Sequence, residues 1–447
     1  MESKETVHDV IVLGAGIAGL TVAYRARQAG KSVRLFEKSS RAGGPIRSER
    51  VDGYLLEHGP STVLPREEIM SLVQHLDLDD KLLFSPPGLP RFVRFHGKLR
   101  QVPTSPAEFL ASGLLSVPGR LRVLIEPLVR RRKNGGDETL LAFARRRLGA
   151  EAAERLVAPL VSGVWAGDAG ALSAGSAFPS LRDWEKRYGS LAVGAVASRR
   201  SSKKTSAPKR LMSFYDGLET LPRAIAQALS NEITLNAPAT ELRPGPVWTV
   251  RAGDHEAKGR SVVVTVPAFE AAPLVAPFAA DAALALGQIP YAPVAVLHLG
   301  IPADRVGRAP HGFGYLVVPS EPSDILGCLW SSTLFGGRAP EGRHLLTVIM
   351  GGARRPDLAA LPENELVARA LGDLRDIMKV SGRPDFIRVA RHPQGIPQYT
   401  VGHADRIETI SKAEQTFPGL RFAGNYIAGI SVGDVIRHAA ALAAGDL

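Results

Sequence analysis

The segment from Asp9 to Gly19 reads DVIVLGAGIAG, and it decides the fold of the first part of the chain. The apolar, β-branched run from Val7 to Leu13 predicts a strand, and the residues from Ile17 to Ala29 have the composition of a helix that Gly30 ends. A second strand is predicted from Val33 to Phe36. A strand, a helix and a strand in this order predict a βαβ unit with a parallel sheet.

Three glycines follow the first strand with the G-x-G-x-x-G spacing of dinucleotide-binding turns. Gly14 permits the tight turn, Gly16 lets the backbone approach a pyrophosphate, and Gly19 allows the helix and the strand to pack closely. The N–H groups at the helix start, Ile17 and Ala18, are expected to face phosphate. Glu37 ends the second strand, where it can accept hydrogen bonds from ribose hydroxyls and would repel the 2′-phosphate of NADP. A purely structural glycine turn is the disfavoured alternative.

A second glycine pair lies in the segment from Arg41 to Arg47, RAGGPIR. In NAD dehydrogenases the second strand usually leads straight into the next crossover, whereas here glycines and arginines follow it. The segment resembles the R-x-G-G loop of the amine-oxidase-like flavoproteins, which covers the FAD pyrophosphate. A glycine-rich turn with surface arginines is the alternative. The resemblance implies FAD contacts from Lys38, Arg41, Gly43, Gly44 and Arg47.

Length and composition set the broad class of the protein. A chain of 447 residues with 45% apolar composition can bury large cores in two or three domains. The polar start, MESKETVHDV, lacks the features of a secretory signal, so we expect a cytoplasmic protein. The single cysteine, Cys328, excludes an internal disulfide and a cysteine-rich metal site, and we expect it to be a small buried hydrophobe. No metal site is predicted.

The net charge of +11 is concentrated in three segments. These are Arg120–Lys133, Arg145–Arg147 and Arg199–Arg210, of which the last resembles a basic loop. Such clusters attract anionic lipid or nucleic acid, but they lack the interleaved aromatic residues of a single-strand binder. We therefore expect an anionic membrane surface as partner and no nucleic acid.

One basic segment also carries an apolar helical face. Leu121, Leu124, Ile125 and Leu128 follow one another at i, i+3, i+4 and i+7, and Pro127 would kink the helix. No run of about eighteen apolar residues occurs, so we expect peripheral attachment at the inner face of the cell membrane rather than a spanning helix. A helix whose apolar face turns toward the core is the alternative.

The C-terminal segment from Leu420 to Ile436, LRFAGNYIAGISVGDVI, predicts a strand, a small-residue loop and a helix start. Backbone N–H groups there could face a ligand. With four further motifs, and in the same order over nearly the whole chain, the sequence resembles the oxygen-dependent protoporphyrinogen oxidases. The four motifs are IRS (46–48), LEHGPS (56–61), VSGVWAGD (161–168) and GIPQY (395–399).

The resemblance implies an FAD enzyme that oxidises protoporphyrinogen IX to protoporphyrin IX in a six-electron reaction, with oxygen as acceptor and hydrogen peroxide as by-product. A homodimer is compatible with it. The rivals are coproporphyrinogen III oxidation by the same chemistry, an amine oxidase, a carotenoid desaturase, and a membrane-associated flavin-binding module without turnover. Further FAD contacts are implied for Gly59, Pro60, Ser61, Gly424, Asn425, Ile430 and Ser431.

Residues for the substrate also come from the resemblance. Arg91 matches an arginine that pairs with a propionate, for which a guanidinium is suited because it can form two parallel bonds. Gly163 matches a position whose backbone faces the reacting carbon, Phe335 an apolar residue stacked on the pyrroles, and Leu316 is expected to line the same pocket. His392 departs from the tryptophan of many relatives, and a lone histidine is more often simply hydrogen-bonded.

The expected fold is α/β, with a discontinuous Rossmann-like FAD domain, a β-sheet substrate domain and a helical membrane-associated domain. Alternation of apolar runs with Gly and Pro in the middle of the chain predicts the second sheet. The ranges are 1–85, 211–290 and 402–447 for the FAD domain, 86–97 and 291–401 for the substrate domain, and 98–210 for the helical basic domain.

Overall fold

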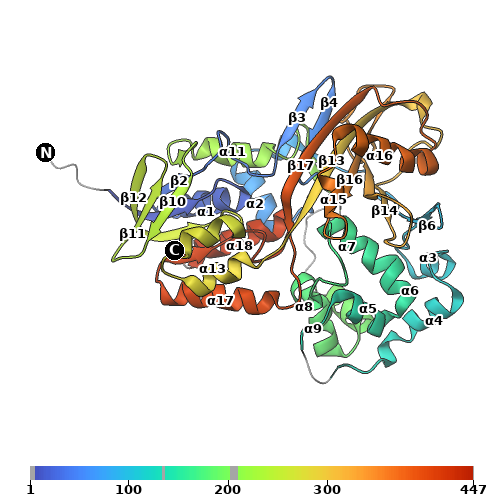
Figure 1. The fold of residues 1–447 in the computed structure, drawn as a ribbon, viewed down its shortest axis with the longest axis horizontal. Coiled ribbons are helices and arrows are strands. Elements are labelled where there is room, and N and C mark those ends of the chain that lie inside the picture. Colours follow the sequence, from blue (N-terminus) through green and yellow to red (C-terminus); the bar gives the residue numbers. More distant parts are fainter. Residues whose placement is uncertain (1–5, 133–135, 202–209, 446–447) are drawn as a thin grey trace.

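The computed structural model describes residues 6–132, 136–201 and 210–445. Two seven-stranded sheets form the two ends of the long axis, and a helical region lies beside the second sheet (Figure 1). The protein has an α/β fold, as predicted. Among the described residues, no helix is both long enough and apolar enough to cross a membrane.

The centre of the first sheet is β1 (Val7–Leu13), which runs parallel to both of its neighbours, β2 (Val33–Phe36) and β12 (His255–Val264). β9 (Ile233–Thr234) adds a further parallel strand beyond β2. The helix α1 (Ile17–Gln28) connects β1 to β2. The predicted βαβ unit is therefore confirmed, with both strands at their predicted residues.

The far edge of β12 has two different neighbours. Its first half forms an antiparallel hairpin with β11 (Trp248–Ala252), which β10 (Ala239–Arg243) extends. Its last residues instead pair in parallel with β18 (Leu420–Phe422). This pairing joins the C-terminal segment to the sheet that contains the N-terminal strand.

Helices cover both faces of the first sheet, and each face has its own apolar core. The first core is formed with α1, α2 (Glu67–His75), α11 (Thr220–Ala228) and α18 (Val432–Gly445). The second core is formed with α12 (Ala268–Val275), α13 (Ala280–Gly287) and α17 (His403–Thr416). The structure also has two small antiparallel sheets: β3 (Ser48–Val51) pairs with β4 (Tyr54–Glu57), and β5 (Leu82–Phe84) pairs with β8 (Met212–Phe214).

The second sheet is antiparallel except for one parallel pair, β14 with β6. In spatial order its strands are β17 (Phe386–Pro397), β13 (Tyr291–Pro302), β16 (Arg343–Gly351), β15 (Ile325–Trp330), β14 (Gly314–Val317), β6 (Arg91–Phe95) and β7 (Lys98–Gln101). The hairpin of β6 and β7 thus extends past residue 97, where the sequence placed the boundary of the substrate domain. Short helices α14 (Ser331–Leu334) and α15 (Pro356–Ala359) flank β16.

Both faces of this sheet are covered at its centre, which explains why the central strands β13 and β16 are nearly continuous apolar runs rather than alternating ones. Leu297 and Val348 point toward α16 (Glu363–Met378) and belong to its core. Their neighbours Val296 and Thr347 point to the opposite face and line a cavity. Because successive side chains of a strand alternate between faces, each strand serves the core and the cavity at once.

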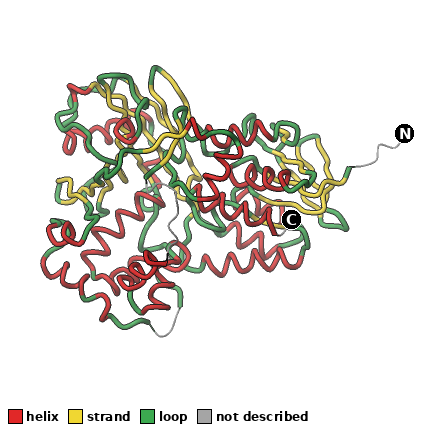
Figure 2. The backbone as a smooth tube through the Cα atoms, turned by 180° about the vertical axis from the view of Figure 1, so that it is seen from behind, coloured by secondary structure: helices red, strands yellow, loops and turns green. Residues whose placement is uncertain are grey.

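The described residues between Pro106 and Ser201 form helices joined by loops, with no named strand among them (Figure 2). Local caps define several helix starts: the Ser116 hydroxyl accepts a hydrogen bond from the Gly119 N–H (3.1 Å), and Pro118 occupies the first turn. One π-helical turn, Ala153–Val157, leads into α7. The helices are α3 (Pro106–Ala111), α4 (Val117–Leu124), α5 (Leu140–Leu148), α6 (Ala150–Ala152), α7 (Ala158–Trp165), α8 (Ala174–Ala177), α9 (Pro179–Tyr188) and α10 (Leu191–Ser201).

The predicted apolar helical face is exposed to solvent, so the alternative of a core-facing helix is wrong. α4 ends at Leu124, and a 3-10 turn from Glu126 to Leu128 follows it around Pro127. The face still points outward, with exposed fractions between 49% and 82%. Its members are Leu121, Leu124, Ile125 and Leu128. Most of the predicted basic loop, residues 202–209, lies outside the described residues, as does Lys133.

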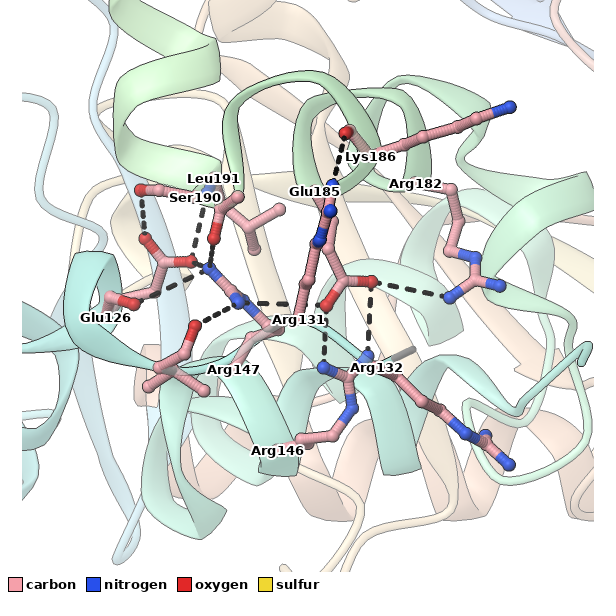
Figure 3. A network of polar contacts seen from close by, with 12 residues as sticks. Glu126, Arg131, Arg132, Arg146, Arg147, Arg182, Glu185, Lys186, Ser190 and Leu191 are labelled. Carbon is pink, nitrogen blue, oxygen red and sulfur yellow. Dashed lines mark hydrogen bonds and ion pairs between the residues drawn. The ribbon is translucent and has the colours of Figure 1, made fainter. Parts of the chain in front are cut away.

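Several arginines of the helical region are bound internally instead of facing a partner (Figure 3). Arg147, expected to attract lipid, is fully buried and forms an ion pair with Glu126. Glu126 in turn accepts hydrogen bonds from the Ser190 hydroxyl (2.6 Å) and the Leu191 N–H (2.9 Å). Arg146 pairs with two carboxylates, at Glu138 and Glu185. The prediction of a lipid-facing cluster at residues 145–147 is wrong for Arg147, because its charge is neutralised inside the domain.

We expect Arg147→Ala to lower the free energy of unfolding by about 3 to 5 kcal/mol, since it leaves the Glu126 carboxylate buried without its cation. Arg145 is a matched control, because it is exposed and pairs with the half-exposed Glu154. Arg145→Ala should cost no more than about 1 kcal/mol. Urea unfolding of both variants measures the difference, and equal midpoints would contradict this account of the network.

Candidate active site

The turn between β1 and α1 is built by close backbone contacts. Gly14 has a φ of +104°, which favours glycine, and a Cβ added to Gly19 would lie 1.9 Å from the Gly14 carbonyl oxygen. The predicted reason for Gly19, close packing of helix and strand, is therefore consistent with the geometry. Residues Ile17 and Ala18 form the first turn of α1 directly after Gly16.

Gly16 faces open space at the start of the helix. A Cβ built on it would have no atom within 4 Å. The second glycine pair lies close by: the Gly43 N–H donates to the Ala15 carbonyl (2.7 Å), and a Cβ on Gly44 would approach the Gly16 Cα to 3.2 Å. Two segments that are separate in sequence therefore form one glycine-lined turn in front of free helix N–H groups, an arrangement that suits phosphate.

The Glu37 carboxylate lies beneath this turn and is buried. One oxygen accepts a hydrogen bond from the Ala15 N–H (2.7 Å), and the other accepts from the N–H and hydroxyl of Ser39. These bonds orient the carboxylate at the end of β2. Its contact with ribose hydroxyls remains a prediction.

The basic residues near the turn are held by neighbouring groups. Lys38 pairs with Glu270 (2.6 Å), and Arg47 lies 3.8 Å from a Glu49 oxygen. Arg41 donates to the Ala42 and Gly44 carbonyls of its own loop, which stabilises the loop. Their contacts with FAD remain predictions.

The C-terminal loop is organised by one tyrosine. The Tyr399 hydroxyl donates to the Asn425 carbonyl (2.6 Å) and accepts from the Gly429 N–H (2.8 Å). Ser431 caps α18, because its hydroxyl accepts from the Asp434 N–H (3.1 Å). The predicted Gly424 and Ile430 belong to the same loop, and α18 packs against α1. Elements from the first and the last part of the chain therefore lie together, as the sequence led us to expect.

A cavity of about 770 Å³ lies between the second sheet, α7 and the loop that follows β4. It brings together residues that are far apart in the sequence. Among its lining residues are every one assigned to substrate, Arg91, Gly163, Leu316 and Phe335, and the three placed near the flavin, Gly59, Pro60 and Ser61. A Cβ on Gly59 would lie 2.1 Å from the Pro45 carbonyl oxygen, so the cavity wall packs directly on the glycine-rich loop.

Gly163 and Leu316 lie next to each other in the wall of the cavity. A Cβ on Gly163 would lie 2.2 Å from a terminal carbon of Leu316. Any side chain at position 163 would therefore displace Leu316. This contact gives a packing reason for glycine on α7 that the sequence could not show.

Arg91 begins β6 with its side chain exposed. Its guanidinium lies 5.2 Å from the centre of the Phe313 ring, and within the described residues it has no ion pair or side-chain hydrogen bond. The cavity thus presents an uncompensated cation among largely apolar walls. Such a cation suits a carboxylate.

Two charged residues of the cavity wall were not assigned from the sequence, Glu57 and Arg338. They form a buried ion pair with an N–O distance of 3.1 Å. Glu57 stands inside the LEHGPS motif, which was the only signal available. His392 does not line the cavity; its Nε2 bonds the His58 carbonyl oxygen (2.7 Å), which agrees with a simply hydrogen-bonded histidine.

Comparison with known proteins agrees with this geometry. Residues 17–445 match the family described as flavin-containing amine oxidoreductase. The chain belongs to this family and is an FAD-dependent oxidoreductase. Its glycine turn fits the cofactor, because the space in front of Gly16 is free and the helix N–H groups there lack protein acceptors within the helix.

Within the family, the chain is similar to proteins that act on porphyrinogens. It is 34% identical to the chloroplastic protoporphyrinogen oxidase of Oryza sativa subsp. japonica, over 96% of this chain and 86% of the relative. It is 30% identical to the coproporphyrinogen III oxidase of Bacillus subtilis (strain 168), over 96% of this chain and 95% of the relative. A crystal structure from Exiguobacterium sp. 255-15, provisionally assigned as a protoporphyrinogen oxidase, superimposes with a TM-score of 0.82 at 25% identity, covering 98% of each chain.

The glycine turn allows FAD binding to be separated from folding. We expect Gly16→Val to give folded, colourless protein, because a Cβ there would have no protein atom within 4 Å and the side chain would occupy the space in front of the helix. Gly19→Val should instead reduce stability, because its Cβ would clash with the Gly14 carbonyl. Circular dichroism and the flavin absorption of both variants check this. A yellow Gly16→Val protein with wild-type FAD content would contradict the assignment of Gly16.

Proposed function

We propose that this protein oxidises protoporphyrinogen IX to protoporphyrin IX, with oxygen as the electron acceptor and hydrogen peroxide as by-product. The observation that carries the proposal is the cavity, in which Arg91, Gly163, Leu316 and Phe335 face one space beside Gly59 of the flavin side. Its volume and apolar walls suit a macrocycle, and the protoporphyrinogen oxidase relatives support that substrate.

Bound FAD would supply the electron-accepting chemistry, taking hydride from a methylene bridge of the substrate. The residues of the chain would orient the ring for this step rather than ionise. Phe335 and Leu316 offer apolar surfaces for the pyrroles, and the Arg91 guanidinium would pair with a propionate at the cavity mouth. Holding a bulky substrate in one orientation at the right distance is itself a large contribution to rate.

Coproporphyrinogen III is the second candidate substrate. The similarity to the Bacillus subtilis enzyme, which spans nearly both whole chains, favours it. The two substrates differ in their number of propionates. Aerobic turnover of each porphyrinogen by the purified protein, followed by porphyrin fluorescence, tests the proposal, and the absence of turnover with both would overturn it.

We expect Arg91→Ala to lower kcat/KM about ten- to hundredfold with normal FAD content, because a charge-assisted bond to the propionate is worth roughly 1.5 to 3 kcal/mol. Arg91→Lys should rescue it only partly, since it keeps the charge but loses the two-pronged geometry. Arg388 is a matched control: its guanidinium also lies 5.2 Å from a phenylalanine ring, but it does not line the cavity. Equal kcat/KM for Arg91→Ala and Arg388→Ala would remove Arg91 from the site.

We further propose that the protein attaches to the inner face of the cell membrane through the exposed apolar face from Leu121 to Leu128. Exposed apolar side chains carry a free-energy cost in water that the interface of a bilayer relieves. Arg130 is exposed beside this face and adds attraction to anionic lipid. Leu160 and Val164 are also exposed, and they line the cavity. The same region therefore offers an apolar surface next to the cavity, where we propose that the largely apolar substrate enters.

Sedimentation with anionic vesicles tests this attachment. We expect the double variant Leu124→Glu/Leu128→Glu to lose vesicle binding, because it places charges on the apolar face. Leu284→Glu is the control, since Leu284 on α13 is 63% exposed but lies on the flavin-binding side of the molecule. Wild-type binding should also weaken at high salt. Equal binding by the double variant and the wild type would assign the contact to another surface.

A further inference from the structure

A buried ion pair joins the second sheet to the flavin-binding part of the chain, by which we mean the predicted FAD domain (residues 1–85, 211–290 and 402–447). Arg338 lies between α14 and β16 of the second sheet, whereas Glu57 ends β4. Both side chains are buried, with exposed fractions of 2% and 7%, and their closest N–O distance is 3.1 Å. Both also line the active-site cavity.

Arg338 makes three other contacts, and together they fix the loop that it belongs to. Its Nη2 donates to the Ser213 hydroxyl (2.6 Å), and its backbone carbonyl accepts from the Leu55 N–H (3.1 Å). Its guanidinium also lies 5.3 Å from the centre of the Phe335 ring. One arginine therefore connects two strands of the flavin-binding part, β4 and β8, to the phenylalanine proposed to stack on the substrate.

Hydrogen bonds within the flavin-binding part also fix the position of the Glu57 carboxylate. Its two oxygens accept hydrogen bonds from the Leu218 N–H (2.9 Å) and from the Ser48 hydroxyl (2.6 Å). A Cβ on Gly217 would lie 3.1 Å from one of these oxygens and closer still to Ser48. The carboxylate is therefore a rigid acceptor, and the position of Arg338 is defined relative to it.

This pair is costly to bury. Burial raises the pKa of Glu57 to about 7, although Arg338 and two hydrogen bonds act in the opposite direction. Burial also lowers the pKa of Arg338 despite the attraction of Glu57. Both shifts favour the neutral forms, so desolvation outweighs the attraction within the pair. A buried pair of this kind adds little stability, and its value lies in defining geometry.

We propose that the Glu57–Arg338 ion pair is a positioning device that locks the Phe335 loop onto the flavin-binding part and so sets the distance between the substrate ring and the flavin. The role of the pair in catalysis rests on the proposed porphyrinogen oxidation. Neither residue needs to touch the reacting carbon. Loosening the pair would let the ring bind but would misplace it, and small misplacements of reacting atoms reduce rate steeply.

The pair also makes activity depend on pH near neutrality. The charged groups that face it are Arg50 on β3 and Glu219, which accepts a hydrogen bond from the Ser48 N–H. When the pH falls through about 7, Glu57 gains a proton and its bond to Arg338 weakens. We therefore expect kcat to decline on the acid side of this value, and Glu57→Gln should remove that inflection because its amide does not titrate.

The test compares Arg338→Lys and Glu57→Gln with the wild-type holoenzyme. We expect normal FAD content, a fall in kcat on the order of tenfold, and a change in KM of less than about threefold. Hydrogen–deuterium exchange gives a readout without activity: residues 331–340 should exchange faster in both variants. Arg147→Lys is the control, because Arg147 forms an equally buried pair with Glu126 away from the cavity.

Each outcome decides the proposal. Faster exchange in the 331–340 segment with unchanged kcat would overturn it, and so would loss of FAD or unfolding in both variants, which would make the pair merely structural. A rise in KM alone would mean that the pair binds substrate instead. If the wild-type protein oxidises no porphyrinogen, the proposed function fails. Hydrogen–deuterium exchange and the binding of protoporphyrin IX, followed by flavin absorption, then still test whether the Glu57–Arg338 ion pair holds the Phe335 loop in place.

Discussion

The close approach of backbone segments around Gly16 is the constraint on which the rest of the molecule depends. The start of α1 must lie against β1, which leaves no room for a side chain at Gly19, and the loop from Arg41 to Arg47 must close over the same turn. Gly59 then packs on the carbonyl of Pro45 in that loop. The cavity wall is therefore positioned by the same glycine-lined turn that is predicted to face the pyrophosphate of FAD, so the predicted cofactor site and the cavity form one connected unit.

The second sheet completes this unit through the alternation of its strands. Residues such as Leu297 fill the core with α16, and the intervening residues, such as Val296, line the cavity. The result is a largely apolar space in a protein with a net charge of +11. Within the described lining, the charged side chains are Arg91, Glu57 and Arg338, and the last two neutralise each other. Arg91 therefore remains as the cation that a carboxylate could reach.

The helical region shows how charge and apolar surface are divided in the folded chain. A run of basic residues suggests a uniformly cationic surface, yet a charge that becomes buried requires a partner, and Arg147 finds one in Glu126. The apolar residues of the face from Leu121 to Leu128 behave in the opposite way, because they stay exposed instead of packing into the core. The exposed surface of this region is thus more apolar and less basic than the composition of the segment indicates.

The sequence by itself determined the elements that local rules govern. The strand at residues 7–13, the glycine spacing, the acid at Glu37 and the burial of Cys328 all follow from short-range geometry and composition, and the ordered motifs were sufficient for the family. The tertiary structure alone decided which residues meet across the molecule. Glu57 ends strand β4, whereas Arg338 lies in the loop between α14 and β16, and nothing in the sequence around either residue predicts the other. Hydrophobic periodicity indicates the local backbone conformation but not which distant residue a side chain contacts. It therefore could not predict the ion pair between Glu57 and Arg338, the burial of Arg147 or the contact of Gly163 with Leu316.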